Sequence, residues 1–497
     1  MHTRHPPPRG LAPLLTIGGL WLGLLLVYRL WLAPTPMQQA DRLFVQGHYT
    51  AAHHAYRSHA DSTPTPSAAL LLRIGMLHTV RGEYGSASHT LWQAIGQGLP
   101  PAQHDLALLY LGVSSARSDN LALALTIWQE YPLCKAATCP YAGVRQTLIG
   151  DALLAQRDYA AARAAYAAAL DLPLDPAWHQ IARTRYALLL AADDPQAAQA
   201  VLERTPTHPR PAPFTAPLVP PRIAQEQQLL SNILHANPAD HAQLLGQLYT
   251  RYGYDALALA TFSQVPATSP HARSAAAYRA YLTWRTSPAY TDLGELDTFQ
   301  QTTPNDPAAT TLLLLATMTT AALSHSSVPT TTFAQLPNGT PERALLEAIW
   351  HVFERDYTTA SMHMQQLLAR SSGIQRGHYA LWVARFHLDR AYAVCTEGHT
   401  AAELAVQSLP DESAAWTVLA GVLFQCGDDV GAQHAAQQAI AYDQAVPALS
   451  PPAEAWLYLG AAHLRQGNAT AARHALTTAA DLAPASVWRE RAELLLR

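Results

Sequence analysis

The residues best suited to chemistry in this chain are histidines, and four of them stand close together near the N-terminus. The stretch GHYTAAHHAYRSHAD contains His48, His53, His54 and His59. Imidazole is a common zinc ligand, and a helix presents two imidazoles on one face when they are four residues apart. No pair in this stretch has that spacing, so a helix would scatter the rings around its surface. The sequence therefore predicts solvated helix faces here, with no metal site and no cofactor.

The motifs of several large enzyme classes are missing from the sequence. Lysine occurs once, at Lys135, which excludes a phosphate-binding GK[ST] loop and the strand lysine of a protein kinase. There is no HExxH pair and no GxSxG turn. Paired carboxylates such as Asp193 and Asp194 stand where helix caps are expected. We predict no catalytic residues and no enzyme, and the alternative hypothesis is an unrecognised active site within 272–409.

The charge of the chain argues against nucleic acid as a partner. The formal net charge is −4, and only 14% of the residues are charged. No cluster of arginines forms a basic stripe that could neutralise phosphates. Because nearly all of the positive charge is arginine, the composition suggests a bacterial source with a GC-rich genome.

The elements that position these residues are expected to be short helices in pairs. In WLYLGAAHLRQGNATAARHALTTAADLAP, Trp456–Pro484, apolar or small residues recur with the i, i+3, i+4 spacing of a helix face in two runs. Between the runs, Gly467 can reverse the chain, and Asn468 or Thr470 can cap the second helix. Small residues such as Gly460 let the two helices approach closely. The stretch therefore predicts a tight helical hairpin.

This hairpin resembles a tetratricopeptide repeat, a 34-residue helix-turn-helix unit. Counting Ala453 as its first position, eight signature places of that family are held by Trp456, Leu459, Gly460, His463, Ala472, Leu476, Ala479 and Pro484. Only His463 and Leu476 depart from the pattern, since both replace aromatic residues. Seven further copies in the same register are recognised through Gly47, Gly75, Gly112, Gly150, Gly246, Tyr357 and Trp416.

The resemblance implies an all-α fold, an α-solenoid of tetratricopeptide-like repeats that follows one N-terminal transmembrane helix. An ordinary helical bundle, the alternative, would not place glycine and alanine at fixed phases of a 34-residue period. The expected organisation is a short basic tail (1–10), a transmembrane anchor (11–32), an N-terminal solenoid (37–204), a proline-rich linker (205–221) and a C-terminal solenoid with irregular helical segments (222–497). The linker contains seven prolines and is expected to run extended over the surface as a semi-rigid spacer.

The N-terminal stretch LAPLLTIGGLWLGLLLVYRLWLAP is apolar enough to cross a membrane. It has no small-residue cleavage site at its end, which favours an uncleaved signal-anchor over a cleaved signal peptide, the alternative. The short tail with Arg4 and Arg9 favours a cytoplasmic N-terminus. We therefore predict a single-pass protein of the cell membrane, anchored through residues 11–32, with its solenoid outside the cytoplasm.

The resemblance also implies function, because such repeats bind protein or peptide partners. We predict a membrane-anchored scaffold or adaptor for protein–protein interaction, and the alternative is an accessory or assembly factor that docks on and regulates a cell-envelope enzyme. Relatives that hold a C-terminal carboxylate use Lys, Arg and Asn at five places on their first helices. At the matching places of the last two repeats only Arg465 is of these types, so the clamp is absent. The groove is instead expected to be mildly apolar, suited to an amphipathic helix or an extended apolar segment, and lined by Thr417, Gly421, Phe424, Leu457, Ala461 and Leu464. The alternative is that these side chains pack against a neighbouring loop or one another.

Four cysteines occur, and two of them are close in sequence. Cys134 and Cys139 lie in LCKAATCP, which is expected to form a loop between hairpins. A ring this small closes at modest entropic cost, so we predict a Cys134–Cys139 disulfide if the solenoid is exported. Cys395 and Cys426 are expected to be poorer partners, because neighbouring first helices lie about 8–10 Å apart. The alternative is four reduced thiols.

Overall fold

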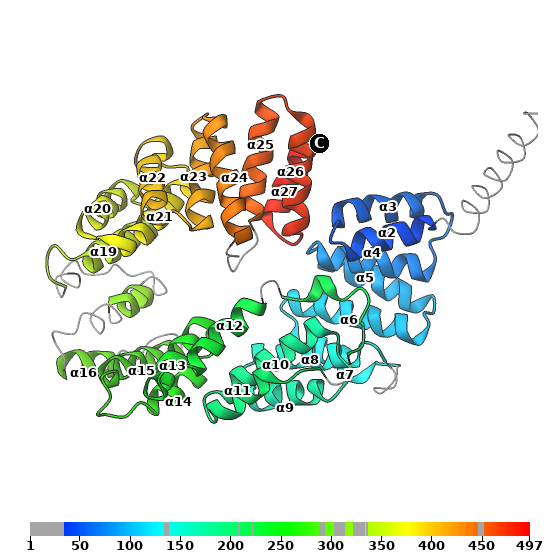
Figure 1. The fold of residues 1–497 in the computed structure, drawn as a ribbon, viewed down its shortest axis with the longest axis horizontal. Coiled ribbons are helices and arrows are strands. Elements are labelled where there is room, and N and C mark those ends of the chain that lie inside the picture. Colours follow the sequence, from blue (N-terminus) through cyan, green and yellow to red (C-terminus); the bar gives the residue numbers. More distant parts are fainter. Residues whose placement is uncertain are drawn as a thin grey trace, which may run out of the picture.

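The computed structural model describes residues 34–133, 139–206, 209–220, 223–287, 294–302, 314–321, 333, 336–445 and 452–497. In this part of the chain, helices follow one another in antiparallel pairs, and an isolated bridge joins Leu174 to Pro209. The pairs stack into a solenoid that curves until its last helices lie beside its first (Figure 1). The predicted all-α repeat solenoid is therefore confirmed.

The predicted location in the cell membrane is overturned. None of the helices in the described ranges is both long and apolar enough to cross a bilayer. The segment 11–32, to which the sequence assigned the anchor, lies outside the described residues.

The N-terminal part of the solenoid is a row of hairpins. They are α2 (Pro36–Val45) with α3 (Tyr49–Asp61), α4 (Ala68–Val80) with α5 (Tyr84–Gly96), α6 (Pro101–Arg117) with α7 (Leu121–Glu130), α8 (Ala142–Ala155) with α9 (Tyr159–Leu170), and α10 (Pro176–Leu190) with α11 (Pro195–Glu203). First helices of successive hairpins contact each other, as α4 does α6 and α8 does α10. We call the surface formed by these first helices the first-helix face, and it lies on the inside of the curve (Figure 1).

The rest of the chain continues the same curve. Its elements are η2 (Ala216–Leu218), α12 (Ile223–Leu234), η3 (Pro238–Asp240), α13 (His241–Tyr252), α14 (Asp255–Ser263), α15 (Ala272–Thr286), α16 (Gly294–Thr302), α19 (Pro341–Phe353), α20 (Tyr357–Arg370), α21 (Gly373–Arg390), the π-helical η5 (Val394–Gly398), α22 (His399–Ser408), α23 (Ser413–Gln425), α24 (Asp429–Ala445), α25 (Ala453–Arg465), α26 (Ala469–Leu482) and α27 (Val487–Leu496). A helical stretch at 314–321 packs Met318 against Trp350 of α19, and Ala316 against Trp284 of α15. This stretch therefore connects α15 with α19 within the solenoid.

The hairpin turns are made by residues in the left-handed region. Gly467 has φ +79°, and the side chain of Asn468 accepts a hydrogen bond from the Ala471 amide, which starts α26. The predicted chain reversal and cap are thus confirmed, with Asn468 as the cap. Arg157 adopts φ +65° at the equivalent place before α9, although it lacks glycine's freedom there.

The two helices of each hairpin touch where a glycine faces a large side chain. A Cβ atom on Gly460 would lie 2.6 Å from Leu476 Cγ, so no larger residue fits without displacing α26. The same arrangement recurs along the chain for Gly75 and Leu91, Gly112 and Trp128, Gly150 and Tyr166, and Gly246 and Phe262. The signature glycines of the repeat are therefore the positions at which the two helices of a hairpin pack closely.

Candidate functional site

The groove residues predicted from the sequence lie together on α23 and α25, but most of them are buried within the solenoid. The buried ones are Thr417, Gly421, Leu457 and Ala461. Leu457 is 4% exposed and belongs to a cluster with Leu476 of α26 and Ala492 of α27. An acidic substitution at Leu457 would therefore damage the core, and the accessible part of the groove is reduced to Phe424 and Leu464.

The first-helix face around α23 is bridged by the chain's own side chains. Arg385 of α21 donates two hydrogen bonds to Glu454 of α25, at 2.6 and 2.8 Å. Gly421 of α23 lies between these two helices, since a Cβ there would lie 2.7 Å from Leu388 Cδ2 of α21 and 2.8 Å from the Tyr458 ring of α25. Burial, with Glu454 close by, raises the pKa of Tyr458. The face is thus closed at this point by a two-pronged ion pair.

The accessible end of the predicted groove combines an aromatic ring with a cation. The Arg465 guanidinium carbon lies 3.7 Å from the centre of the Phe424 ring. Arg465 also donates to the Phe424 carbonyl at 2.8 Å and to Asp429 at 3.1 Å, which fixes its position. Leu464 is 37% exposed next to it. This patch remains a predicted contact site for a partner.

The first-helix face of the N-terminal solenoid is covered by the proline-rich segment, defined as residues 209–220. The Phe214 ring lies 6.0 Å from that of Phe44 in α2, and the Arg73 guanidinium lies 4.1 Å above it. The Thr215 hydroxyl accepts a hydrogen bond from the Trp178 indole nitrogen of α10 at 2.9 Å. The sequence predicts a spacer here and does not indicate these contacts. The available signal was the pair of non-proline residues, Phe and Thr, in the middle of the segment.

The last helices of the chain contact the first hairpins through charged side chains. Arg81, in the turn after α4, pairs with Glu493 of α27 at 2.8 Å, and Arg489 of α27 pairs with Glu83 at 2.9 Å. Burial tends to raise the pKa of Glu83, but hydrogen bonds from His78, Arg489 and Arg81 outweigh it and hold this pKa well below its usual range. We call these two ion pairs the ring clasp.

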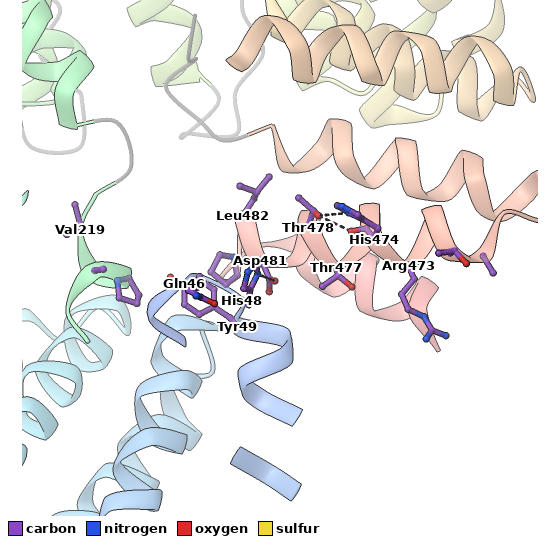
Figure 2. Close-up of a pocket in the computed structure, with 16 residues that line it drawn as sticks. Gln46, His48, Tyr49, Val219, Arg473, His474, Thr477, Thr478, Asp481 and Leu482 are labelled. Carbon is purple, nitrogen blue, oxygen red and sulfur yellow. Dashed lines mark hydrogen bonds and ion pairs between the residues drawn. The ribbon is translucent and has the colours of Figure 1, made fainter. Parts of the chain in front are cut away.

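A cavity lies beside the ring clasp, between α26, the turn before α3 and the proline-rich segment (Figure 2). Its volume is about 1030 Å³, large enough for a small molecule or a short peptide. One wall is fixed where the amide and hydroxyl of Thr50 both donate to Asp481 at 2.9 Å. Burial raises the pKa of Asp481 despite these two hydrogen bonds. Burial and the nearby Asp481 raise the pKa of Tyr49, which also lines the cavity, to about 12.

The histidines near the N-terminus do not converge. Among the residues that the structure describes, no three side chains of the metal-ligating types come together. The His53 ring lies 5.9 Å from that of His54 and 6.5 Å from that of His78. Burial and the neighbouring Arg81 lower the pKa of His53 to about 4, so it is neutral at pH 7.

The disulfide found in the structure is the one that the sequence disfavoured. Cys395 and Cys426 are bonded, with their Cα atoms 5.5 Å apart. The expectation that they would be too distant is wrong, because Cys395 lies in the π-helical turn η5, which contacts α23, rather than on a regular helix. Cys139 is buried beside Asp105, and Cys134 lies outside the described residues. The Cys134–Cys139 bridge stays a prediction.

Comparisons with known proteins add little beyond this geometry. No protein-family model matches the chain, and no curated protein matches it. Among solved structures, the APC/C hetero-tetramer of Cut9 and Hcn1 shares 12% identity over 90% of this chain and 87% of that one, with a TM-score of 0.30. Yeast Tom70 shares 11% identity over 93% and 94% (TM-score 0.30), and the TPR domain of P58(IPK) 13% over 80% and 99% (TM-score 0.24). With TM-scores this low, these structures support no statement about the function of this chain. The chain is a helical-repeat solenoid of tetratricopeptide-like hairpins on the strength of its own packing and signature residues.

Proposed function

We propose that this chain is a non-catalytic scaffold for protein–protein interaction, and that it binds a segment of a partner protein on its first-helix face. The observation that carries this proposal is the proline-rich segment. A separate stretch of polypeptide, which contains the 3-10 helix η2, already lies on the first-helix face of the N-terminal solenoid, held there by side chains of α2, α4 and α10. A surface of this kind in this chain therefore accommodates a peptide.

On the C-terminal solenoid, the proposed contact is the patch formed by Phe424, Leu464 and Arg465. It presents an aromatic ring, an aliphatic side chain and a fixed guanidinium within two neighbouring first helices. Aromatic residues and arginine are enriched at the cores of protein interfaces. A partner segment with an apolar anchor and an acidic group fits it best. The cavity beside the ring clasp is a second concave surface near the same end of the chain.

The test is site-specific photo-crosslinking in the native host. A crosslinking amino acid is placed at Phe424 or at Leu464, with Val430 as the matched control, because Val430 is an exposed apolar residue on the second helix α24. We expect one and the same protein to be captured from both groove positions and not from position 430. A Phe424→Asp change should remove the adduct at 464 while the far-UV circular dichroism is unchanged.

Capture of identical proteins from positions 424, 464 and 430, or of none from the groove positions, would reject this patch as the binding site. No feature of the described residues favours the alternative of an accessory factor for a cell-envelope enzyme.

A further inference from the structure

The proline-rich segment crosses the first helices of several hairpins rather than touching a single one. At its start, the Arg210 amide donates to the Leu174 carbonyl at 3.0 Å, before α10. Further along, Ala212 is buried in the same apolar cluster as the first hairpins, and Leu218 and Val219 pack against that cluster. The segment thus runs across the first-helix face in an irregular path, with a turn at Phe214 followed by the short 3-10 helix η2.

Two buried donors of the face are satisfied only by this segment. The Tyr110 hydroxyl of α6 donates to the Phe214 carbonyl, and the Trp178 indole donates to the Thr215 hydroxyl at 2.9 Å. Tyr110 and Trp178 are 0% and 1% exposed. An occupant that covers a donor without accepting from it leaves that donor buried and unsatisfied, which weakens its binding. Any occupant of this face must therefore offer two acceptors at neighbouring residues.

The contacts of Thr215 require a hydroxyl group as well as a side chain of this shape. Its hydroxyl donates to the Ala212 carbonyl at 2.8 Å while it accepts from the Trp178 indole. Serine could make both hydrogen bonds, whereas valine, which has the same shape, could make neither. The face therefore distinguishes a hydroxyl residue from an aliphatic one.

The pocket for the phenylalanine is held together without the segment. Arg73, which lies over the Phe214 ring, donates to both carboxylate oxygens of Asp41, at 2.9 and 3.4 Å. Asp41 also accepts from the Tyr56 hydroxyl at 2.6 Å. Because these contacts lie within the first two hairpins, the aromatic site is preorganised for any ligand that brings a ring.

The segment itself is not relaxed in this position. Phe214 has φ +67°, a left-handed conformation that is strained for a bulky L-residue. The connections at both ends of the segment restrict the path it can take. A ligand without those connections can present a ring and a hydroxyl without this strain. It can therefore compete with the proline-rich segment for the first-helix face.

We propose that residues 209–220 are a tethered ligand of the first-helix face, and that a partner competes for this face with a proline-flanked segment carrying a phenylalanine–threonine or phenylalanine–serine pair. The inference rests on the proposed scaffold function and names the chemistry of one of its partners. Prolines suit such a ligand because they restrict its backbone before it binds. The tether gives the internal segment an effective concentration on the order of millimolar, so a partner binds weakly until the segment is displaced.

The test measures binding of a fluorescent peptide with the sequence of residues 209–220. The full chain is compared with a variant in which those residues are replaced by a glycine–serine linker of equal length. We expect at least tenfold tighter peptide binding to the linker variant than to the unaltered chain. The peptide with Thr215→Ser should retain that affinity, and the peptide with Thr215→Val should lose about tenfold, which is the cost expected for one missing hydrogen bond.

A linker variant that is helical, melts cooperatively and does not bind the peptide would overturn the proposal, because the segment would then be only part of the core. Equal affinity for the Thr215→Val peptide would overturn the proposed recognition of the hydroxyl. If the linker variant does not fold, a chain with protease sites at 207–208 and 221–222 is cut at both places. Exchange of the released segment for labelled peptide supports the proposal, and its retention or the unfolding of the chain overturns it. These outcomes are independent of crosslinking at 424 and 464, so the scaffold function can stand when this inference fails.

Discussion

The two halves of the solenoid use the same hairpins and complete their first-helix faces by different means. In the N-terminal half, the neutral donors Tyr110 and Trp178 are covered by the proline-rich segment, which accepts through the Phe214 carbonyl and the Thr215 hydroxyl. In the C-terminal half, the ion pair of Arg385 and Glu454 joins the helices on either side of Gly421. The repeat signature governs how the two helices of a hairpin pack, and it leaves the inner surface free to differ. One half consequently depends on a bound segment and the other on side-chain chemistry.

The largest effect is expected from truncating Trp178, and it should be confined to the N-terminal half. Truncation by Trp178→Ala removes a buried indole and the hydrogen bond to Thr215, at a cost of about 3–5 kcal/mol. Hydrogen exchange followed by mass spectrometry should show faster exchange in α10 and in 209–220, with α21 to α25 unchanged. Trp92→Ala is the control, since Trp92 is 47% exposed on the outer helix α5. Equal exchange rates of α10 and 209–220 in the Trp178→Ala and Trp92→Ala variants would contradict the dependence of the N-terminal half on the proline-rich segment.

Loss of the disulfide should, in the same way, destabilise the C-terminal half alone. Cys395 and Cys426 are 31 residues apart in sequence, and loss of a bridge of this length costs about 2–4 kcal/mol. The double change to serine is expected to lower the denaturant midpoint of the C-terminal half alone. Mass spectrometry after alkylation of the native protein checks the bond and also tests the predicted Cys134–Cys139 pair. Alkylated Cys395 in the untreated protein would refute the bridge.

A smaller effect is expected from the ion pair over Gly421. Arg385→Ala leaves Glu454, whose side chain is 11% exposed, without its strongest partner, at a cost of about 1–3 kcal/mol. Arg163→Ala is the matched control, because Arg163 and Asp193 form an exposed pair and such pairs contribute less than about 1 kcal/mol. Urea denaturation measures both. If the two variants lose the same stability, the bridge over the C-terminal face is not stabilising.

The last effect concerns the ring clasp, where the two halves meet. Arg489→Glu replaces attraction to Glu83 by repulsion, and because the two side chains are 10% and 30% exposed, the cost is about 1–3 kcal/mol, as for Arg385. We expect a larger radius of gyration in X-ray scattering with unchanged helicity. Because the folded pKa of Glu83 is depressed, its contribution is fully present above the unfolded value of about 4.3 and is lost as the pH falls through the folded pKa. Scattering curves that coincide for both proteins from pH 7 to pH 3 would show that the clasp does not hold the ends.

Local features of the fold were predictable because they depend on residues close in sequence. The spacing of Gly460 and Leu476 within one hairpin is enough to fix their contact, and Gly467 with Asn468 is enough to form the turn. The apolar patterns of the irregular region around 272–287 likewise indicate helix correctly.

The features that were missed depend on the curvature of the whole array. Phe214 reaches Phe44 only because successive hairpins bend around it, and no sequence period records that bend. Leu457 has a groove position in the repeat, but the helix α27 that follows the last repeat covers its cluster. The bonded cysteines were misjudged because a regular helix was assumed where the π-helical turn η5 occurs.

The meeting of the first and last hairpins also changes the way in which such an array can come apart. In a linear stack, each outer repeat has one neighbour, so fraying starts there by breaking a single interface. Here α26 contacts α3, and α27 is joined to the turn after α4, so the outer repeats have neighbours on both sides. Removing any one repeat from this cyclic array requires two interfaces to break together. Spontaneous opening is then expected to begin at the interior junction with the fewest apolar contacts rather than at the ends of the array.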